Sequence, residues 1–418
     1  MSQVIRPTPM PSEPLSALVG LPGGGWSLDS ISSWLVTEGR RLGDFGRLIQ
    51  GLFERLEAAR APVWRVRIGI RTINPVFYSH AVEWWRGKDK VGVWQVGHAI
   101  TESDDYRGSP IQWVHQNGIT YRRRLTQLEP SDHSVLHSIR GLGGFDYLAI
   151  PIIFTDGQIN VMTLSTDRAD GFSDADIAKF EALINLLTPI LESIAVRRLA
   201  TSLLDTYLGH RTGQRVLNGQ FKRGDAETLE AALWFSDLRD FTPITESLSA
   251  EEMLATLNAY FEFVAAATTS RGGEILRFIG DAMLIVFPTA QHGDLATACQ
   301  SALDAAEDAF ASLATANVMR RHRGEPEINF GVGLHAGTVV YGNVGAPDRL
   351  DFTVMGTAVN RTARLEGLTK KLGRPLLLSA EVASLVKVET ESLGAHEMKG
   401  VAEPQEVFCL KKGACSGC

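Results

Sequence analysis

The pattern of apolar residues in the second half of the chain predicts a strand followed by a helix. Residues 231–235 form a short apolar run, which is typical of a buried strand. Ser249 and Glu252 then form a capping box, the usual start of a helix. Apolar side chains follow at helical spacing up to Gly272-Gly273, where the helix should end: Met253, Leu254, Leu257, Tyr260, Phe261 and Val264.

A hairpin is predicted next. Residues 274–278 and 283–287 are strand-like runs on either side of Ile279-Gly280-Asp281-Ala282, where the glycine suits a tight turn. If the hairpin folds back beside the first strand, its tip residue Asp281 comes close to Asp237, which follows that strand. Either aspartate alone is more often a helix cap or a turn residue.

Two more strands and a helix are predicted downstream. Residues 328–334 alternate as a half-buried strand, and residues 339–344 form a second strand after an expected turn at Ala336-Gly337. A helical stretch then begins at residue 356 and ends at Gly373.

The first half of the chain predicts an arm, then helices, then a sheet. Residues 1–30 begin as a Pro- and Gly-rich segment and predict a flexible arm. Amphipathic spacing between residues 31 and 59 suits one or two helices, and strand-like runs follow at 64–70 and 91–96.

A heptad-like seam lies between the two halves. Its apolar residues recur every three or four positions and continue toward Leu203 and Leu204, with a helix kink expected at Pro189. Two interpretations are open: a parallel coiled pair between two chains, or a helix packed on the sheet of its own domain. The seam comprises Phe180, Leu183, Ile184, Leu187, Leu191 and Ile194.

The composition indicates a globular chain of two or three domains. The chain has 418 residues, 44% of them hydrophobic, and a net charge of −7. A negative balance argues against a nucleic-acid or anionic-membrane partner. No apolar run approaches the ~20 residues of a membrane span, and the start lacks a signal-peptide core, so a cytoplasmic location is expected. Cys415 and Cys418 are spaced as Cys-x-x-Cys, but residues 412–418 are more simply interpreted as a disordered tail.

Asp237 and Asp281 are the strongest candidates for chemistry. Two carboxylates at one point offer the oxygen ligands that hard divalent cations prefer, and beside backbone amides they suit phosphoryl transfer. Asn360 and Arg364 are four residues apart, so one helix face presents an amide and a guanidinium. That pair suits a ribose and a phosphate charge, although an isolated Asn-Arg pair is more often a solvated surface.

Five motifs follow one another in the second half of the chain: Phe235-Ser-Asp-Leu-Arg-Asp-Phe-Thr242, Phe278-Ile-Gly-Asp281, Gly333-Leu-His-Ala-Gly337, Tyr341-Gly-Asn-Val-Gly345 and Ala358-Val-Asn-Arg-Thr-Ala-Arg364. In this order and spacing, they resemble the catalytic domain of class III nucleotidyl cyclases over residues 225–411. The resemblance implies an α+β fold of ferredoxin-like type. The family reaction is attack of the ribose 3'-hydroxyl on the α-phosphate of a nucleoside triphosphate, giving a cyclic 3',5'-monophosphate and pyrophosphate.

The resemblance also implies a role for individual residues. Asn360 would orient the ribose, and Arg364 would neutralise charge on the α-phosphate. Family enzymes build the site between two catalytic domains, so one copy per chain implies a homodimer. The remaining positions are Asp237, Asp281 and the Leu238 carbonyl for two Mg²⁺ or Mn²⁺ ions, and Phe241 and Thr242 for the phosphate loop.

The base-reading positions depart from the commonest family pattern. Arg277 and Thr353 stand where adenylate-specific relatives usually carry Lys and Asp. A Thr there resembles subclass IIIb, which makes cyclic AMP, and its hydroxyl can accept from the adenine amino group. Guanylate-specific relatives tend to carry an acid in place of Arg277, so ATP is favoured and a guanylate cyclase is the alternative. Lys399 resembles a triphosphate-binding lysine, but in some relatives that lysine lies two residues later, where this chain has Val401.

Three segments of the first half stand in a recognisable order: Tyr147-Leu-Ala-Ile-Pro-Ile-Ile-Phe154, residues 159–165 and Gly171-Phe-Ser173. Through them, residues 31–195 resemble a GAF domain, an antiparallel sheet with helices. It implies a regulatory domain that binds a small molecule or holds a dimer together. Residues 174–222 would form a connecting helix and linker that contribute to the homodimer.

Other functions stay open at this point. The first is an inactive cyclase-fold protein with a signalling or interaction role, which the intact Asp, Asn and Arg set argues against. The second is a diguanylate cyclase, hinted at by Gly272-Gly273-Glu274, although Ile275 and Leu276 follow where that family needs an acid and an aromatic. Seven of the eight tryptophans lie before residue 115, which fits either a ligand pocket or ordinary core packing.

Overall fold

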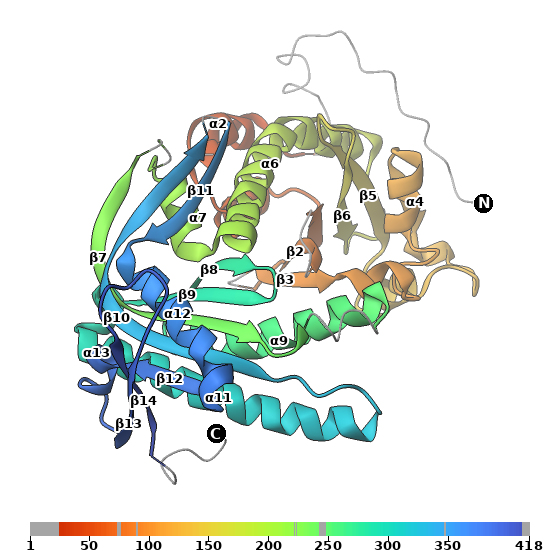
Figure 1. The fold of residues 1–418 in the computed structure, drawn as a ribbon. Helices are drawn as coiled ribbons and strands as arrows, with labels where there is room; N and C mark the ends of the chain where they lie inside the picture. Colours follow the sequence, from red (N-terminus) through yellow and green to blue (C-terminus); the bar gives the residue numbers. More distant parts are fainter. Residues whose placement is uncertain are drawn as a thin grey trace. The chain divides into compact units, whose positions relative to one another are not determined.

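The computed structural model describes residues 25–72, 77–88, 91–220, 222, 224–241, 248–346 and 348–411 (Figure 1). The chain divides into two compact units, with unit 1 ending at Leu203 and unit 2 beginning at Leu204. This division falls inside helix α6, Asp174–Leu208. Within the described ranges, no helix combines the length and apolar character of a membrane span.

Unit 1 is built on a six-stranded antiparallel sheet in the order β3-β2-β1-β6-β5-β4. The strands are β1 Arg65–Arg71, β2 Phe77–Trp85, β3 Gly92–Gly97, β4 Tyr121–Arg124, β5 Asp146–Ile153 and β6 Ile159–Thr166. The helices are α2 Asp29–Thr37, α3 Phe45–Ala58, α4 Pro110–Asn117, α5 Ser134–Gly141 and α6, with short 3-10 turns at Gly39–Arg41, His98–Glu102 and Leu125–Gln127. The mixed sheet-and-helix class is confirmed, while the GAF identity stays a prediction.

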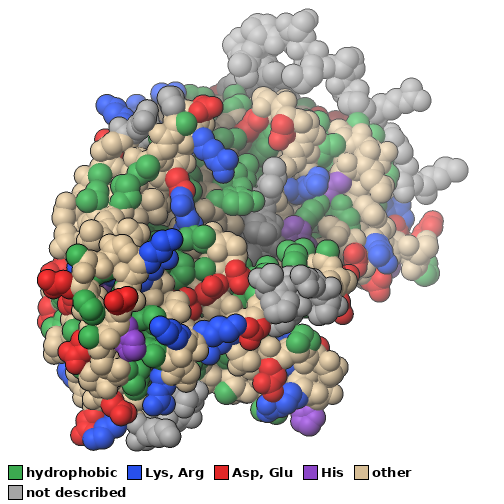
Figure 2. Space-filling model, in the orientation of Figure 1, with side chains coloured by type: hydrophobic (Ala, Val, Ile, Leu, Met, Phe, Trp, Pro, Cys, Tyr) green, Lys and Arg blue, Asp and Glu red, His purple; other side chains and the backbone are tan. Residues whose placement is uncertain are grey.

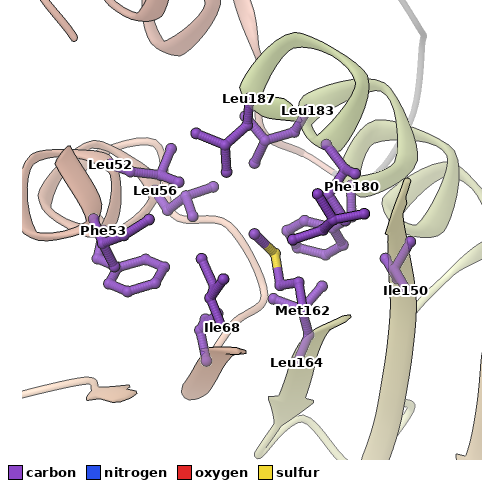
Figure 3. Packing of buried hydrophobic residues seen from close by; sticks show 14 of the residues in the cluster. Leu52, Phe53, Leu56, Ile68, Ile150, Met162, Leu164, Phe180, Leu183 and Leu187 are labelled. Carbon is purple, nitrogen blue, oxygen red and sulfur yellow. The ribbon is translucent and has the colours of Figure 1, made fainter. Parts of the chain in front are cut away.

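The main core of unit 1 lies between one face of this sheet and helices α3 and α6. In Figure 3, Leu52, Phe53 and Leu56 of α3 and Phe180, Leu183 and Leu187 of α6 point toward Ile68, Met162 and Leu164 of the sheet. The heptad-like seam is therefore buried within unit 1 as far as Ile194, as a helix packed on its own sheet. Beyond it, Val196 and Tyr207 are 60% and 80% exposed.

Helix α6 runs unbroken from Asp174 to Leu208 with Pro189 inside it. The expected kink at this proline therefore does not end the helix. A smaller cluster, including Val114 of α4 and Tyr147 of β5, covers the opposite face of the sheet.

Unit 2 contains an eight-stranded sheet in the order β13-β14-β12-β10-β7-β9-β8, with β11 paired to β10. The strands are β7 Ala226–Leu238, β8 Glu274–Ile279, β9 Ala282–Pro288, β10 Phe330–Ala346, β11 Arg349–Met355, β12 Leu376–Ser379, β13 Thr390–His396 and β14 Gln405–Leu410. The helices are α7 His210–Leu217, α9 Ala250–Ser270, α10 Thr289–His292, α11 Leu295–His322, α12 Thr357–Leu372 and α13 Ala380–Ala383. Neighbouring strands are antiparallel except for β10 and β12.

Helices α9 and α11 pack on one face of this sheet, and α12 packs on the other. One buried cluster joins α9 and α11 to Ala232 and Trp234 of β7. Another joins Ala358 of α12 to Leu233 of β7. Because successive strand residues point to opposite faces, Asp237 lies on the α12 face with Leu233.

The predicted strand, capped helix and hairpin are confirmed as β7, α9 and β8–β9. Ser249 and Glu252 form both hydrogen bonds of the capping box. The turn expected at Ala336-Gly337 is wrong, because β10 is one continuous strand that pairs with β7 through this point. A Cβ at Gly337 would lie 3.2 Å from the Cβ of Ala358, so this glycine makes room for α12 instead of forming a turn.

A buried polar network fixes α7 to the sheet. The hydroxyls of Thr212 and Tyr341 are 2.8 Å apart, and Tyr341 donates to Glu274 Oε1 at 3.0 Å. The guanidinium of Arg215 lies 4.9 Å from the Tyr341 ring centroid. The segment that follows α6 is thereby anchored to β8 and β10.

Charges of both signs are interspersed on the visible surface (Figure 2). This matches a chain with 41 basic and 48 acidic residues.

Two glycines of β10 let α12 pack directly on the strand. A Cβ at Gly331 would lie 2.5 Å from Glu366 Oε1, and one at Gly333 would lie 2.6 Å from the Glu366 backbone nitrogen. Real Cβ atoms essentially never come this close to another atom. The missing side chains therefore determine how close α12 lies to the sheet.

We predict that Gly333→Ala destabilises the protein by about 1–3 kcal/mol, because the added methyl meets backbone atoms that cannot rotate away. Gly367→Ala on α12 is the matched control. Nothing lies within 4 Å of its Cβ position, and alanine should stabilise the helix by roughly 0.5–1 kcal/mol. Chemical denaturation measures both variants, and equal stabilities would contradict the close packing.

Candidate active site

Strand pairing brings Asp237 and Asp281 together. In the antiparallel pair of β7 and β9, Asp237 lies opposite Ala282, so the preceding residue, Asp281, is its neighbour. Gly280 adopts a φ of +64° in the β8–β9 turn. Burial, followed by the charge and hydrogen bond of Asp281, raises the pKa of Asp237 to about 6. The structure thus places the two predicted metal ligands in contact.

The pair fits a divalent cation. Two neighbouring carboxylates cannot both ionise cheaply without a proton or cation between them. Asp237 Oδ1 is buried and finds no hydrogen-bond donor in the described part of the chain. Because Mg²⁺ uses one or two carboxylates and keeps several waters, the pair matches its preference.

Few other protein ligands lie nearby. The described residues hold no cluster of three or more His, Cys, Asp or Glu side chains that could bind a metal. Leu238 is buried, and its backbone hydrogen bond to Asp237 orients that carboxylate. The role of the Leu238 carbonyl as a ligand stays a prediction.

Asn360 and Arg364 lie on the exposed face of α12. Within the described ranges, neither side chain makes a hydrogen bond or an ion pair, and neither contacts the two aspartates. The 3.6-residue period of the helix places Asn360 and Arg364 on one face and directs Glu366 toward strand β10. A single chain therefore does not bring its amide and guanidinium to its own acidic pair.

Glu366 is an acidic neighbour that sequence reasoning missed. Its carboxylate lies over Gly331, which is paired with Asp237 across β10 and β7. Burial, followed by the Asp237 charge, raises the pKa of Glu366 to about 7. The sequence does contain a signal for this position. Glu366 follows Arg364 by two residues, so it lies on the opposite face of the helix, the face that packs on the sheet.

Arg277 forms an ion pair with Asp351 of β11, a partner that the sequence did not suggest. Thr353 lies two residues further along the same strand, on the same face, and is largely buried. Since β8 and β11 contact each other, the two predicted base-reading residues lie on neighbouring strands. The structure adds a carboxylate beside them.

The other predicted residues lie outside this cluster or outside the described ranges. Phe241 is partly buried against the core, while Thr242 lies outside the described residues, as do Cys415, Cys418 and the arm up to residue 24. Lys399 is exposed in the turn between β13 and β14. Cys299 and Cys409 are buried free thiols.

Comparison with known proteins identifies the segment that carries this cluster. Residues 225–412 match the family model of the adenylate and guanylate cyclase catalytic domain. "Adenylate cyclase 1" of Rhizobium meliloti is 34% identical over 197 residues, covering 46% of this chain and 29% of that protein. "Adenylate cyclase 2" of the same organism is 30% identical over 254 residues, covering 59% of this chain and 65% of that protein.

The crystal structure of the adenylyl cyclase CyaB from P. aeruginosa is 25% identical, with a TM-score of 0.42, and covers 44% of this chain and 95% of that chain. The present chain spans less than two thirds of the length of each of the two Rhizobium meliloti relatives. The family match and these relatives support a class III adenylate/guanylate cyclase catalytic domain in residues 225–412.

We predict that Asp237→Asn stabilises the metal-free protein near pH 7.5 but not near pH 4. Folding raises the pKa of Asp237 from 3.8 to about 6, so the native state holds more protons than the unfolded chain between these values. Stability therefore falls as the pH rises through this window. Solvent screening at the half-buried carboxylate limits the gain to about 1 kcal/mol.

Denaturation with a metal chelator at both pH values measures this gain. Asp240→Asn is the matched control, because the exposed Asp240 pairs with Lys370 at 2.5 Å and not with the acidic pair. Millimolar Mg²⁺ should raise the stability of the unchanged chain more than that of the Asp237 variant. A gain of equal size at both pH values would contradict the assignment.

Proposed function

We propose that the chain is an adenylate cyclase that converts ATP to cyclic 3',5'-AMP and pyrophosphate. The observation that carries the proposal is the contact between Asp237 and Asp281 inside the segment that matches the cyclase family. The names of the two curated relatives favour adenylate over guanylate cyclase activity.

In this proposal, Asp237 and Asp281 hold two Mg²⁺ or Mn²⁺ ions, with the Leu238 carbonyl as a further ligand. Bound ions supply two effects: they lower the pKa of the ribose 3'-hydroxyl and neutralise the triphosphate. The protein residues position the substrate. Asn360 hydrogen-bonds the ribose, and Arg364 donates to α-phosphate oxygens as negative charge grows on them.

The reaction breaks one phosphorus–oxygen bond and forms another. The 3'-oxygen forms a bond to the α-phosphorus, and the bond from that phosphorus to the bridging oxygen breaks. Pyrophosphate leaves with the electron pair of the broken bond, and the proton of the 3'-hydroxyl passes to solvent water. Phe241, Thr242 and Lys399 are assigned to the phosphates by motif position alone.

We place the complete site between two copies of the chain. Support comes from the exposure of Asn360 and Arg364, which do not pair with the aspartates of their own chain. Phe278 and Ile279, close to Asp281 in sequence, are 53% and 45% exposed, and such an apolar surface suits a partner chain. Val196, Leu203 and Tyr207 of α6 are exposed at spacings of seven and four, which suits a second contact along residues 174–222.

Arg277 and Thr353 are assigned to the adenine base, with Arg277 donating to a ring nitrogen and Thr353 accepting from the amino group. A guanylate cyclase is the second candidate, and Asp351 is the observation in its favour. A carboxylate held beside Arg277 can accept from the N1–H and amino groups of guanine.

Unit 1 is proposed as a GAF-like regulatory domain over residues 31–195, joined by the connecting helix to a catalytic domain over residues 225–411. Its antiparallel sheet with helices supports this assignment. A cavity on one face of that sheet supports a small-molecule ligand.

We predict that the purified chain with Mn²⁺ and ATP forms cyclic AMP, and that Asp281→Ala lowers the rate by about 100-fold or more. Asp240→Ala, on the neighbouring surface, should keep most of the activity. Chromatography of products from equal ATP and GTP measures both activity and base preference. Cyclic GMP as the main product would replace the adenylate assignment with the guanylate one, and activity in Asp281→Ala would refute the metal site.

The shared site predicts complementation between two inactive variants. Asp237→Ala and Arg364→Ala chains should each be inactive as homodimers. Their heterodimer contains one intact site, so mixing should restore up to about half of the activity per dimer. Absence of recovery, with subunit exchange proven by differently tagged chains, would place the site within one chain.

A further inference from the structure

Unit 1 has a cavity of about 350 Å³ on the face of its sheet opposite α3 and α6. Strand alternation separates the two faces of β1, because Ile68 packs in the α3–α6 core while Arg67, Gly69 and Arg71 line the cavity. Helices α4 and α5 contribute the opposite wall, including His115. The volume suits a small ligand.

Two guanidinium groups at this cavity form no ion pair with a carboxylate in the described part of the chain. Within the described ranges, the side chains of Arg67 and Arg71 make no hydrogen bond or ion pair. Glu83, which lies opposite Arg67 in β2, forms its ion pair with Arg65 instead. Both groups lie against aromatic rings: the guanidinium carbon of Arg67 is 5.4 Å from the ring centroid of Trp94, and that of Arg71 is 5.2 Å from the ring centroid of Tyr78.

Partial burial makes the charge of Arg67 costly. Desolvation, followed by the charge of Arg65, lowers the pKa of Arg67, and the charges of Glu83, Tyr147 and Asp105 oppose this only in part. A buried guanidinium remains charged and is normally matched by an anion. Asp105 is a carboxylate of the lining, but it is exposed and makes no ion pair with either arginine.

The histidine of the lining neither adds to this positive charge nor cancels it. Burial, followed by the charge of Arg71, lowers the pKa of His115 to about 4, so this histidine is neutral at physiological pH. Its Nδ1 is 2.9 Å from the hydroxyl of Tyr106. Apolar surface from Ala81, Val161 and Tyr147 completes the cavity.

Gly69 leaves open the space between the two arginines. It lies two residues from each on β1, on the same face, and no atom lies within 4 Å of its Cβ position. The φ angle of Gly69 is not positive, so the strand backbone could accept any residue at this position. The consequence of having glycine here is therefore the open space in the cavity.

We propose that this cavity binds a small organic anion, a carboxylate or phosphate on an apolar body, with Arg67 and Arg71 as the anion-binding groups. This deepens the regulatory role proposed for unit 1. Guanidinium groups suit either oxyanion, because their fixed donors match the oxygen geometry of both. The apolar lining beside them favours an organic anion over a free inorganic one.

Isothermal titration calorimetry of the full chain tests this proposal with benzoate and phenyl phosphate as probes. Benzamide, which has the shape of benzoate without its charge, and inorganic phosphate are the controls. Binding is measured without ATP or metal, so a failure here is distinguishable from a failure of the cyclase proposal. We expect at least one of the two anions to bind, and the stronger one identifies the headgroup.

Three variants separate the proposed contacts from a structural role. Arg67→Met should weaken binding about tenfold or more and raise the melting temperature of the free protein, because an unpaired buried charge is removed. Arg67→Lys should keep part of the affinity. Gly69→Val should fill the cavity and abolish binding without lowering the melting temperature, since the space is open and valine suits a strand.

Four results would overturn the proposal. These are no binding of either anion, equal binding of benzamide, unchanged affinity in both Arg67→Met and Gly69→Val, or a lower melting temperature for Arg67→Met. The last result would assign Arg67 to the stability of the sheet instead.

Discussion

Repulsion between carboxylates held at one point is the constraint on which unit 2 depends. The antiparallel register of β7 and β9 fixes Asp237 against Asp281, and Gly280 makes the turn that leaves the second carboxylate at the strand end. Glu366 adds acidic charge from α12. A half-buried acidic cluster of this kind costs free energy unless a cation or protons neutralise it. The fold therefore holds together negative charge that a bound cation or protons would neutralise.

Two glycines of β10 determine how close helix α12 lies to the acidic pair. Because Gly331 and Gly333 have no side chains, α12 lies close enough to place Glu366 over the strand that pairs with Asp237. The same helix phase turns Asn360 and Arg364 outward. One helix thus adds negative charge to its own site and presents a positive charge elsewhere. Since Glu366 and Arg364 occupy opposite faces of one rigid helix, the proposed active site would take its guanidinium from a second chain.

The parts of the fold that depend on adjacent residues could be predicted from the sequence, whereas contacts between distant parts of the chain could not. The capping box at Ser249 and the glycine turn at Gly280 each depend on a few adjacent residues, so the sequence specifies α9 and the β8–β9 hairpin directly. Gly337 was misinterpreted because a glycine that makes room for a helix and a glycine that makes a turn have the same sequence signature. Glu366 and Asp351 were missed for a related reason. Their importance arises from partners on other strands, which periodicity cannot identify.

Each of the two units contains charged side chains that no opposite charge among the described residues neutralises, acidic in unit 2 and basic in unit 1. Unit 2 places acidic side chains together where Asp237 Oδ1 has no donor, and unit 1 places Arg67 and Arg71 at a cavity where neither has an acceptor in the described ranges. Neither charge is matched by the opposite charge on a neighbouring element: Glu83 forms its ion pair with Arg65, and the guanidinium of Arg364 lies on the outer face of α12, away from the acidic pair. Proteins retain unpaired, partly buried charge mainly where a ligand completes it, because folding alone gains nothing from it. The two proposals follow from this rule: a cation with a nucleotide would complete the acidic pair in unit 2, and an organic anion would complete the arginines in unit 1.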